Sequence, residues 1–389
     1  MKVILLIFII IAVSSCVPTE NLSRFSDAEI QTVDIYNSKL CNISAAGVNK
    51  INLNKGVGTM RIKQSDLIDT IIFLPLETTE ESVFGYIDKL LMSDDRIIIK
   101  DGDGRFLIFD DKGNFISKSI KGNGPGEINK LWDIAFDDKR QYIIAYQSDH
   151  LSYFDKNGNF IEKKRSPIMF KEFCTKDSGF VFYQDQFINY HLGKEADNAI
   201  LLSDGNFAVY GKGARTCPFS LVSSRTNIQK NCGLTLVSPI LNDTIYEIIS
   251  DGIKAKYIIE YDKQKTKLSS VDDIKTSDKF YYMGCMFENS KTQLFEFWSY
   301  KHGLCFTFHD KWTNNVVGGT IISNNENELP LCLGTTLTVH NDYFVSYNTP
   351  YNGMHFNSSI VADLENKKVE KLNDDDNAVL IFYKIKTIQ

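Results

Sequence analysis

The stretch "FDDKGNFI", Phe109–Ile116, recurs as "FDKNGNFI", Phe154–Ile161, and this repeat decides the fold. Its glycines, Gly113 and Gly158, lie 45 residues apart, and a weaker copy, "LSDGNFAVYG" (Leu202–Gly211), follows after a similar interval. A repeat of about 40–50 residues made only of strands and turns is typical of the blades of a β-propeller. We expect each glycine to take a positive φ angle in the hairpin between the two outer strands of a blade.

Short apolar runs around the repeat predict further strands, and turn residues separate them at short intervals, as in an antiparallel all-β protein. Examples are "DTIIFLPLE" (Asp69–Glu77), "DRIIIKD" (Asp95–Asp101) and "YIIAY" (Tyr142–Tyr146). Residues 57–389 then divide into six four-stranded antiparallel blades of roughly 55 residues each. We expect the six-bladed β-propeller to close by pairing strands from both ends of the chain, "MRIKQSDLIDTIIFLPLE" (Met60–Glu77) with "NAVLIFYKIK" (Asn377–Lys386).

The first 15 residues have the pattern of a signal peptide that ends in a lipobox. Lys2 precedes an apolar run, Val3–Val13, which is too short to span a bilayer, and "VSSC" ends at Cys16. We therefore expect residues 1–15 to be removed and Cys16 to be lipidated, with acyl chains such as palmitate anchoring the protein to a membrane. A simple secretory signal with an incidental cysteine is the alternative. We expect residues 16–56, which are polar and irregular in pattern, to form a flexible tether.

The net charge and the cysteine spacing limit the classes of molecule and metal that we expect this protein to bind. The formal net charge is −6, or −7 once Lys2 is removed, and a mildly acidic surface argues against nucleic acid. The eight cysteines are scattered without a CxxC pair, so the sequence shows no zinc or thioredoxin signature. Cys217 and Cys232 are candidates for a disulfide, and buried free thiols are equally compatible with the spacing.

The glycine-rich stretch "GNGPGE", Gly122–Glu127, raises the possibility of a phosphate-binding loop. Such a loop needs a helix start after it. Here Trp132, Ile134 and Phe136 follow in alternation with polar or small residues, which is a strand pattern. We therefore expect a crossing between two blades, after which Trp132–Phe136 forms the inner strand of the next blade.

Other motifs have both a structural and a chemical interpretation. "DGDG" (Asp101–Gly104) and "DDDN" (Asp374–Asn377) could bind calcium, but a hairpin turn and a solvated turn are the favoured interpretations. The tryptophans Trp132, Trp298 and Trp312 could stack on a sugar, although packing is favoured. The six histidines, which the channel of a propeller could bring together around a metal, are His150, His191, His302, His309, His340 and His355. We assign no catalytic, metal-binding or cofactor-binding residue, and Cys16 is the only site residue that we predict.

Several segments resemble the six-bladed β-propeller lipoproteins of Gram-negative bacteria, which are relatives of the NHL-repeat propellers. They are "FLPLETTEESVFGYIDKLLMSDDRIIIKD" (Phe73–Asp101), "GNGPGE", "FDKNGNFI", "NDTIYEI" (Asn242–Ile248) and "DDDNAVLIFYKIK" (Asp374–Lys386). That group commonly has Asn-Pro before its last strand, where this chain has Asn377-Ala378. The resemblance implies an exported, membrane-tethered propeller. It implies no particular activity.

These observations lead to two hypotheses for function. The first is a monomeric, non-catalytic binding or scaffold module without a cofactor, held at the cell envelope and meeting a protein, peptide or glycan at one face of the ring. We expect the periplasmic side of the outer membrane, with surface display as the alternative. The second hypothesis is a metal-dependent lyase, lactonase or hydrolase with its site in the central channel, which rests on analogy between folds alone.

Overall fold

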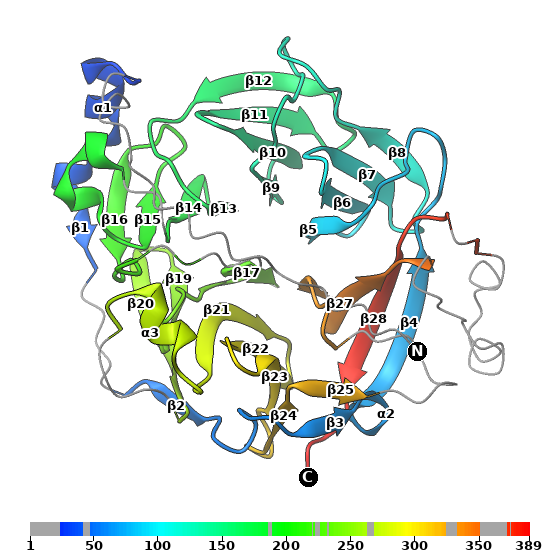
Figure 1. Ribbon diagram of the computed structural model, residues 1–389. Helices are drawn as coiled ribbons and strands as arrows, with labels where there is room; N and C mark the ends of the chain where they lie inside the picture. The colour runs from blue at the N-terminus through cyan, green and yellow to red at the C-terminus, as the bar shows by residue number, and fades with distance from the viewer. Residues whose placement is uncertain are drawn as a thin grey trace.

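The structure is a computed structural model, and it describes residues 24–41, 47–185, 189–219, 221, 226–231, 233–262, 268–323, 333–350, 372–373 and 375–389. Six four-stranded antiparallel sheets surround one axis, as expected for a six-bladed β-propeller (Figure 1). In each sheet the first strand is innermost, and these first strands contact one another around the axis.

The first three blades follow the repeat. Blade 1 comprises β5 (Ile87–Met92), β6 (Arg96–Asp101), β7 (Phe106–Asp110) and β8 (Phe115–Lys118). Blade 2 comprises β9 (Asp133–Asp137), β10 (Tyr142–Gln147), β11 (His150–Asp155) and β12 (Phe160–Arg165). Blade 3 comprises β13 (Glu172–Lys176), β14 (Gly179–Tyr183), β15 (Ile200–Ser203) and β16 (Val209–Gly213), with the 3-10 helices η3 (Tyr190–Leu192) and η4 (Lys194–Ala196) between β14 and β15.

The later blades diverge in sequence but keep the same order. Blade 4 comprises β17 (Ile228–Asn231), β18 (Leu234–Val237), β19 (Thr244–Ile249) and β20 (Gly252–Glu260). The helix α3 (Val271–Lys275) leads to blade 5, which comprises β21 (Tyr281–Glu288), β22 (Thr292–Ser299), β23 (Gly303–Asp310) and β24 (Val316–Gly319). Blade 6 comprises β26 (Thr338–His340), β27 (Tyr343–Asn348), β28 (Val379–Ile385) and β4 (Ile68–Pro75).

Blade 6 closes the ring as the sequence predicts. The N-terminal strand β4 pairs antiparallel with the C-terminal strand β28, in a register that runs from Val379 opposite Pro75 to Ile385 opposite Ile68 (Figure 1). Asn377 stabilises this closure, because its side-chain amide donates to the backbone oxygens of Glu77 and Ser82 and its Oδ1 accepts from Phe84 N–H.

The hairpin glycines of the first two copies of the repeat behave as expected, whereas the prediction for Gly205 in the third copy is wrong. Gly113 and Gly158 have φ angles of +80° and +89° between the third and fourth strands of blades 1 and 2. In the weaker copy in blade 3, Phe207 takes the positive φ angle in place of Gly205. Asp110, Asp155 and Asp204 cap the three turns, each accepting backbone N–H groups two and four residues ahead.

The core consists of apolar layers between neighbouring blades, so both faces of most strands are buried. Between blades 2 and 3, for example, Tyr146 stacks on Phe170 with ring centroids 3.9 Å apart, and Phe170 stacks on Phe182. Burying each such ring contributes about 1.5–3 kcal/mol to folding. This two-sided burial explains why the strands read as apolar runs more often than as strict alternation.

The expectation of a flexible tether over residues 16–56 is wrong for the described parts of that segment. The helix α1 (Asp27–Val33) and the 3-10 helix η2 (Ile35–Asn37) pack on blade 3, where Val33 and Ile35 are buried. Two short strands of this segment then add in parallel to outer strands of blades, β1 (Lys39–Leu40) to β16 and β2 (Asn49–Asn52) to β20. Just beyond the segment, β3 (Arg61–Lys63) pairs in parallel with β25 (Ile321–Ser323) in a separate two-stranded sheet. The short helix α2 (Gln64–Leu67) leads into β4. The physical reason is that the outer strands offer unpaired backbone edges, which this segment covers.

Candidate functional site: the axial pocket

A pocket of about 580 Å³ lies on the axis of the ring. Its wall contains residues from the inner strands of all six blades, for example Leu90, Phe136, Cys174, Lys230, Phe287 and Thr338. The pocket also includes residues of the turns that follow β5 and β9, such as Asp94 and Asp138, and we call this end of the ring the mouth end. A volume of this size falls in the range of small-molecule sites.

A buried ionic cluster lies in the wall of the pocket, towards the start of the inner strands. Lys89 Nζ lies 2.8 Å from Asp133 Oδ1 and 3.4 Å from Glu172 Oε1, so one cation from blade 1 contacts carboxylates from blades 2 and 3. Each carboxylate also accepts a backbone N–H from the following blade, Asp133 from Phe173 at 2.9 Å and Glu172 from Asn227 at 2.6 Å. The cluster therefore ties four consecutive blades together.

Burial and mutual repulsion set the protonation of this cluster. Burial raises the pKa of Asp133 to about 6, and the charge of Glu172 adds to this effect while Lys89 opposes it. Burial alone would lower the pKa of Lys89, but the two carboxylates outweigh it and raise that pKa above its usual value. Lys89 is thus a fixed cation and not a proton donor near neutral pH.

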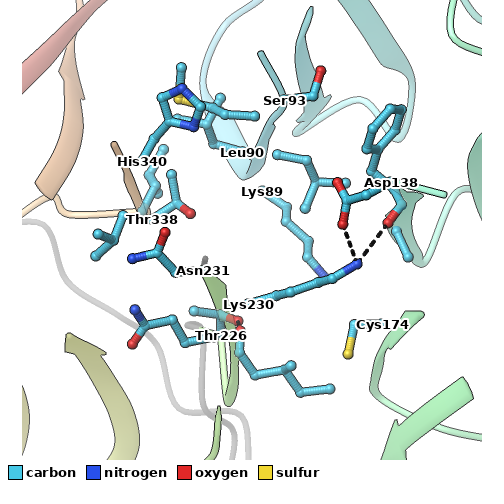
Figure 2. A pocket seen from close by; sticks show the side chains of 18 of the residues that line it. Lys89, Leu90, Ser93, Asp138, Cys174, Thr226, Lys230, Asn231, Thr338 and His340 are labelled. Carbon is cyan, nitrogen blue, oxygen red and sulfur yellow. Dashed lines mark hydrogen bonds and ion pairs between the residues drawn. The ribbon is translucent and has the colours of Figure 1, made fainter. Parts of the chain in front are cut away.

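A second lysine crosses the pocket nearer the mouth end. Lys230 Nζ lies 2.6 Å from Asp138 Oδ2 and donates to Thr175 Oγ1 and to the backbone oxygen of Phe136 (Figure 2). Nearby, burial raises the pKa of the Cys174 thiol to about 11, so this thiol is protonated at neutral pH and is a poor nucleophile.

Uncharged polar side chains make up much of the remaining wall. Asn231, Thr338 and His340 lie around the open part of the pocket in Figure 2. His340 Nε2 lies 2.9 Å from Asn341 Nδ2, and burial lowers the pKa of His340, an effect that Asp94 partly offsets. The imidazole of His340 is therefore mainly neutral at pH 7 and can form hydrogen bonds without carrying a charge.

The structure does not bring together the five histidines that it describes. Four of them are used elsewhere: His150 pairs with Asp149, His191 contacts the Pro167 backbone oxygen, His302 stacks on Phe280, and His309 lies between Gln293 and Asn314. His340 lies in the pocket, and His355 is outside the described residues. Over the described part of the chain, no three His, Cys, Asp or Glu side chains are grouped to hold a metal.

The acidic motifs have structural roles where they are described. Asp101 of "DGDG" begins the β6–β7 turn, accepts from Arg105 N–H and pairs with the Arg105 side chain. In "DDDN", Asp376 accepts from Asn373 N–H and Asn377 forms the closure of the ring, while Asp374 lies outside the described residues.

The three tryptophans do not form one platform. Trp132 is half-buried against Tyr146 in blade 2, Trp298 packs edge-on to Tyr300 in blade 5, and Trp312 is exposed on the β23–β24 turn. The glycine-rich stretch joins β8 to β9, as expected, and Glu127 holds it by accepting Gly124 N–H at 2.8 Å. Trp132 directly precedes β9, which is the inner strand of blade 2.

The structure describes five of the eight cysteines. Cys41, Cys174, Cys217, Cys285 and Cys305 carry free thiols, so Cys217 forms no disulfide here. Cys232, its candidate partner, lies outside the described residues, as do Cys332 and the predicted lipidation site Cys16. Among the described residues, no helix is both long and apolar enough to cross a membrane.

Fold and site together define a six-bladed β-propeller with an axial pocket. The chain belongs to the family described as "Domain of unknown function (DUF4934)", whose model matches residues 48–384. A comparison with curated proteins finds no match.

One solved structure supports the fold, and a second is too weak a likeness to add support. A crystal structure of a Bacteroides fragilis NCTC 9343 protein, described as a candidate exported protein, is similar with a TM-score of 0.64 and 18% identity, covering 87% of this chain and 100% of that one. BamB from Moraxella catarrhalis has a TM-score of 0.42 and 10% identity over 63% of this chain and 66% of its own.

The sequence alone did not indicate the ionic cluster. The feature that could have indicated it is a charged residue near the start of each of three apolar inner strands, with about one blade of sequence between successive residues. These residues are Lys89, Asp133 and Glu172.

Proposed function

We propose that this protein is an exported lipoprotein whose propeller is a non-catalytic binding module, with the axial pocket as its ligand site. The observation that supports this proposal is the pocket of about 580 Å³, whose lysines are already paired with carboxylates and whose open wall carries uncharged polar groups. Such a wall suits a small polar ligand or a side chain of a larger partner that makes several hydrogen bonds. Lipidation of Cys16 would hold the protein at the envelope, on the periplasmic side of the outer membrane.

The binding role is tested by ligand recovery with a blocked pocket. Asn231→Trp places a large ring in the pocket wall near Thr338, whereas Asn129→Trp places the same ring at an exposed position that does not line the pocket. Native mass spectrometry of protein incubated with envelope extract should find a ligand on the parent and on Asn129→Trp, but not on Asn231→Trp. Equal recovery by all three proteins would exclude the pocket as the site, and no recovery by any would count against binding.

The alternative, a metal-dependent enzyme in the channel, is disfavoured by the position of Lys89. Its ammonium group lies against both Asp133 and Glu172 and occupies the space that a metal ion bound by these two carboxylates would need. Metal analysis of the purified protein tests this alternative, because one bound metal per chain would revive it.

The lipid anchor is tested separately. Cys16→Ser should move the protein from the membrane fraction to the soluble exported fraction, and a variant that stays membrane-bound would refute anchoring through Cys16.

A further inference from the structure

The N-terminal chain reaches the ring at the end opposite the pocket mouth. Arg24 pairs with Asp149 and contacts Ser148, both in the turn between β10 and β11. β10 begins at Tyr142, next to the mouth-end turn that contains Asp138, and its six residues span about 20 Å. The two turns therefore lie at opposite ends of blade 2, and we call the end that Arg24 reaches the entry end.

Chain length limits the distance between this end and the anchor. Cys16 and Arg24 are eight residues apart, and even a fully extended backbone covers only about 26–29 Å over that length. A lipid on Cys16 would thus hold the ring against the bilayer, and the entry end would face it. This step rests on the lipid anchor of the proposed function.

An independent observation is the distribution of exposed apolar side chains. The linkers between blades and the turns between second and third strands all lie at the entry end, because each inner strand begins there. Five exposed large apolar side chains lie on these segments, and Tyr36 of η2 lies beside them. We call these six residues the entry face: Tyr36, Val83, Tyr86, Ile120, Tyr190 and Tyr300. Tyr36 belongs to the set because its hydroxyl approaches Gly193, in the same connection as Tyr190.

The remaining exposed large apolar side chains of the described residues lie elsewhere. Most are on or beside outer strands, such as Ile72 of β4 and Phe160 of β12. Trp312, 73% exposed, lies at the mouth end of blade 5. Tyr300, 54% exposed, lies at the entry end of the same blade. The strand β23, whose eight residues span about 26 Å, separates Tyr300 from Trp312.

We infer that the entry face is a membrane-contact surface that rests on the lipid headgroups and keeps the mouth of the pocket turned away from the bilayer. Tyrosine suits this position because its ring is apolar and its hydroxyl is polar, which is the reason for its enrichment at membrane interfaces. The short chain from Cys16 and the apolar entry face both point to the same orientation.

Hydroxyl-radical footprinting tests this orientation. The full lipidated protein is reconstituted on vesicles of phosphatidylethanolamine and phosphatidylglycerol and compared with the soluble Cys16→Ser variant. Oxidation of Tyr86, Tyr190 and Tyr300 should fall several-fold on vesicles, whereas oxidation of Trp312 should be unchanged. Because Tyr300 and Trp312 belong to one blade, the pair controls for unfolding and for general shielding.

A second arm separates this inference from the lipid anchor. The mature chain, with a polyhistidine tag in place of Cys16, is held on the same vesicles through a nickel-chelating lipid, and the same protection of Tyr300 relative to Trp312 is expected. Failure of the native protein to bind vesicles would refute only the anchor, since the tagged chain still reports the orientation. Equal oxidation of Tyr300 on bound and free tagged protein would overturn the membrane-contact surface. Protection in cells but not on vesicles would also overturn it and would indicate a protein partner.

Discussion

Lys89 Nζ lies 2.8 Å from Asp133 Oδ1, and this contact joins the inner strands of blades 1 and 2 beside the pocket. Glu172 adds a second carboxylate from blade 3 at 3.4 Å. All three side chains are largely withdrawn from water, so a charge that loses its partner is left in a poorly hydrated place. Lys89 and Glu172 of this cluster line the pocket, and we expect the cluster also to stabilise the ring.

Replacing Lys89 by Met should destabilise the fold strongly, because it leaves two buried carboxylates without their cation. We expect a loss of about 3–5 kcal/mol in the free energy of unfolding, measured by urea denaturation. Lys50→Met is the matched control, since Lys50 pairs with Glu260 on the exposed surface, where a loss of about 0–1 kcal/mol is expected. Similar losses in the two variants would show that the buried cluster is not what stabilises the ring.

Asp133 should make the stability of the protein fall as the pH rises through about 6. The pKa of its carboxyl is raised from 3.8 to about 6 by burial, so the folded protein keeps a proton that the unfolded chain releases in this interval. The stabilising contribution is full below pH 3.8 and is lost as the pH rises through about 6. The free energy of unfolding of the parent, relative to Asp133→Asn, should fall between these pH values. A flat difference would contradict the raised pKa.

Asp155→Asn provides the opposite control. Burial acts to raise the pKa of Asp155, but hydrogen bonds from Asn159 and from backbone N–H groups outweigh it and lower that pKa. The contribution of Asp155 is therefore present above pH 3.8 and is lost as the pH falls below it. Relative to Asp155→Asn, the parent should lose stability only in that acidic range.

The sequence predicted most of the fold and little of the site. The turn at Gly113 and the apolar run around Ile381 are local signals, so the blades and the closure of the ring could be predicted. The packing of the N-terminal segment could not, because pairing of Lys39 with Gly211 depends on an open edge that exists only in the assembled ring. The contact of Lys89 with Asp133 likewise depends on how neighbouring inner strands meet at the axis, which local pattern does not encode.

Gly113→Ala should cost more stability than Gly303→Ala. Both glycines have a φ angle of +80°, so an added Cβ costs about 1–2 kcal/mol at either position. At Gly113 the new Cβ would also lie 2.4 Å from the backbone oxygen of Pro75 in β4, whereas nothing lies within 4 Å at Gly303. We expect a further loss of about 1–3 kcal/mol at Gly113 from this overlap. Equal melting temperatures for the two variants would show that the turn does not press on the closing strand.

Asn377→Ala should weaken the closure of the ring. The Asn377 side chain donates to the backbone oxygens of Glu77 and Ser82 and accepts from Phe84 N–H at 3.1 Å. Its removal leaves these buried backbone groups without that partner, and at about 1 kcal/mol for each hydrogen bond we expect a loss of about 2–4 kcal/mol.

Hydrogen exchange of Asn377→Ala should show faster opening of β4 and β28 than of blade 3, because the closure joins the two ends of the chain. Asn129→Ala, at an exposed position where the Asn129 side-chain amide donates to Asn123 Oδ1, should change stability by less than about 0.5 kcal/mol. Uniform acceleration of exchange over all blades would instead show that the ring opens cooperatively and that Asn377 has no local role.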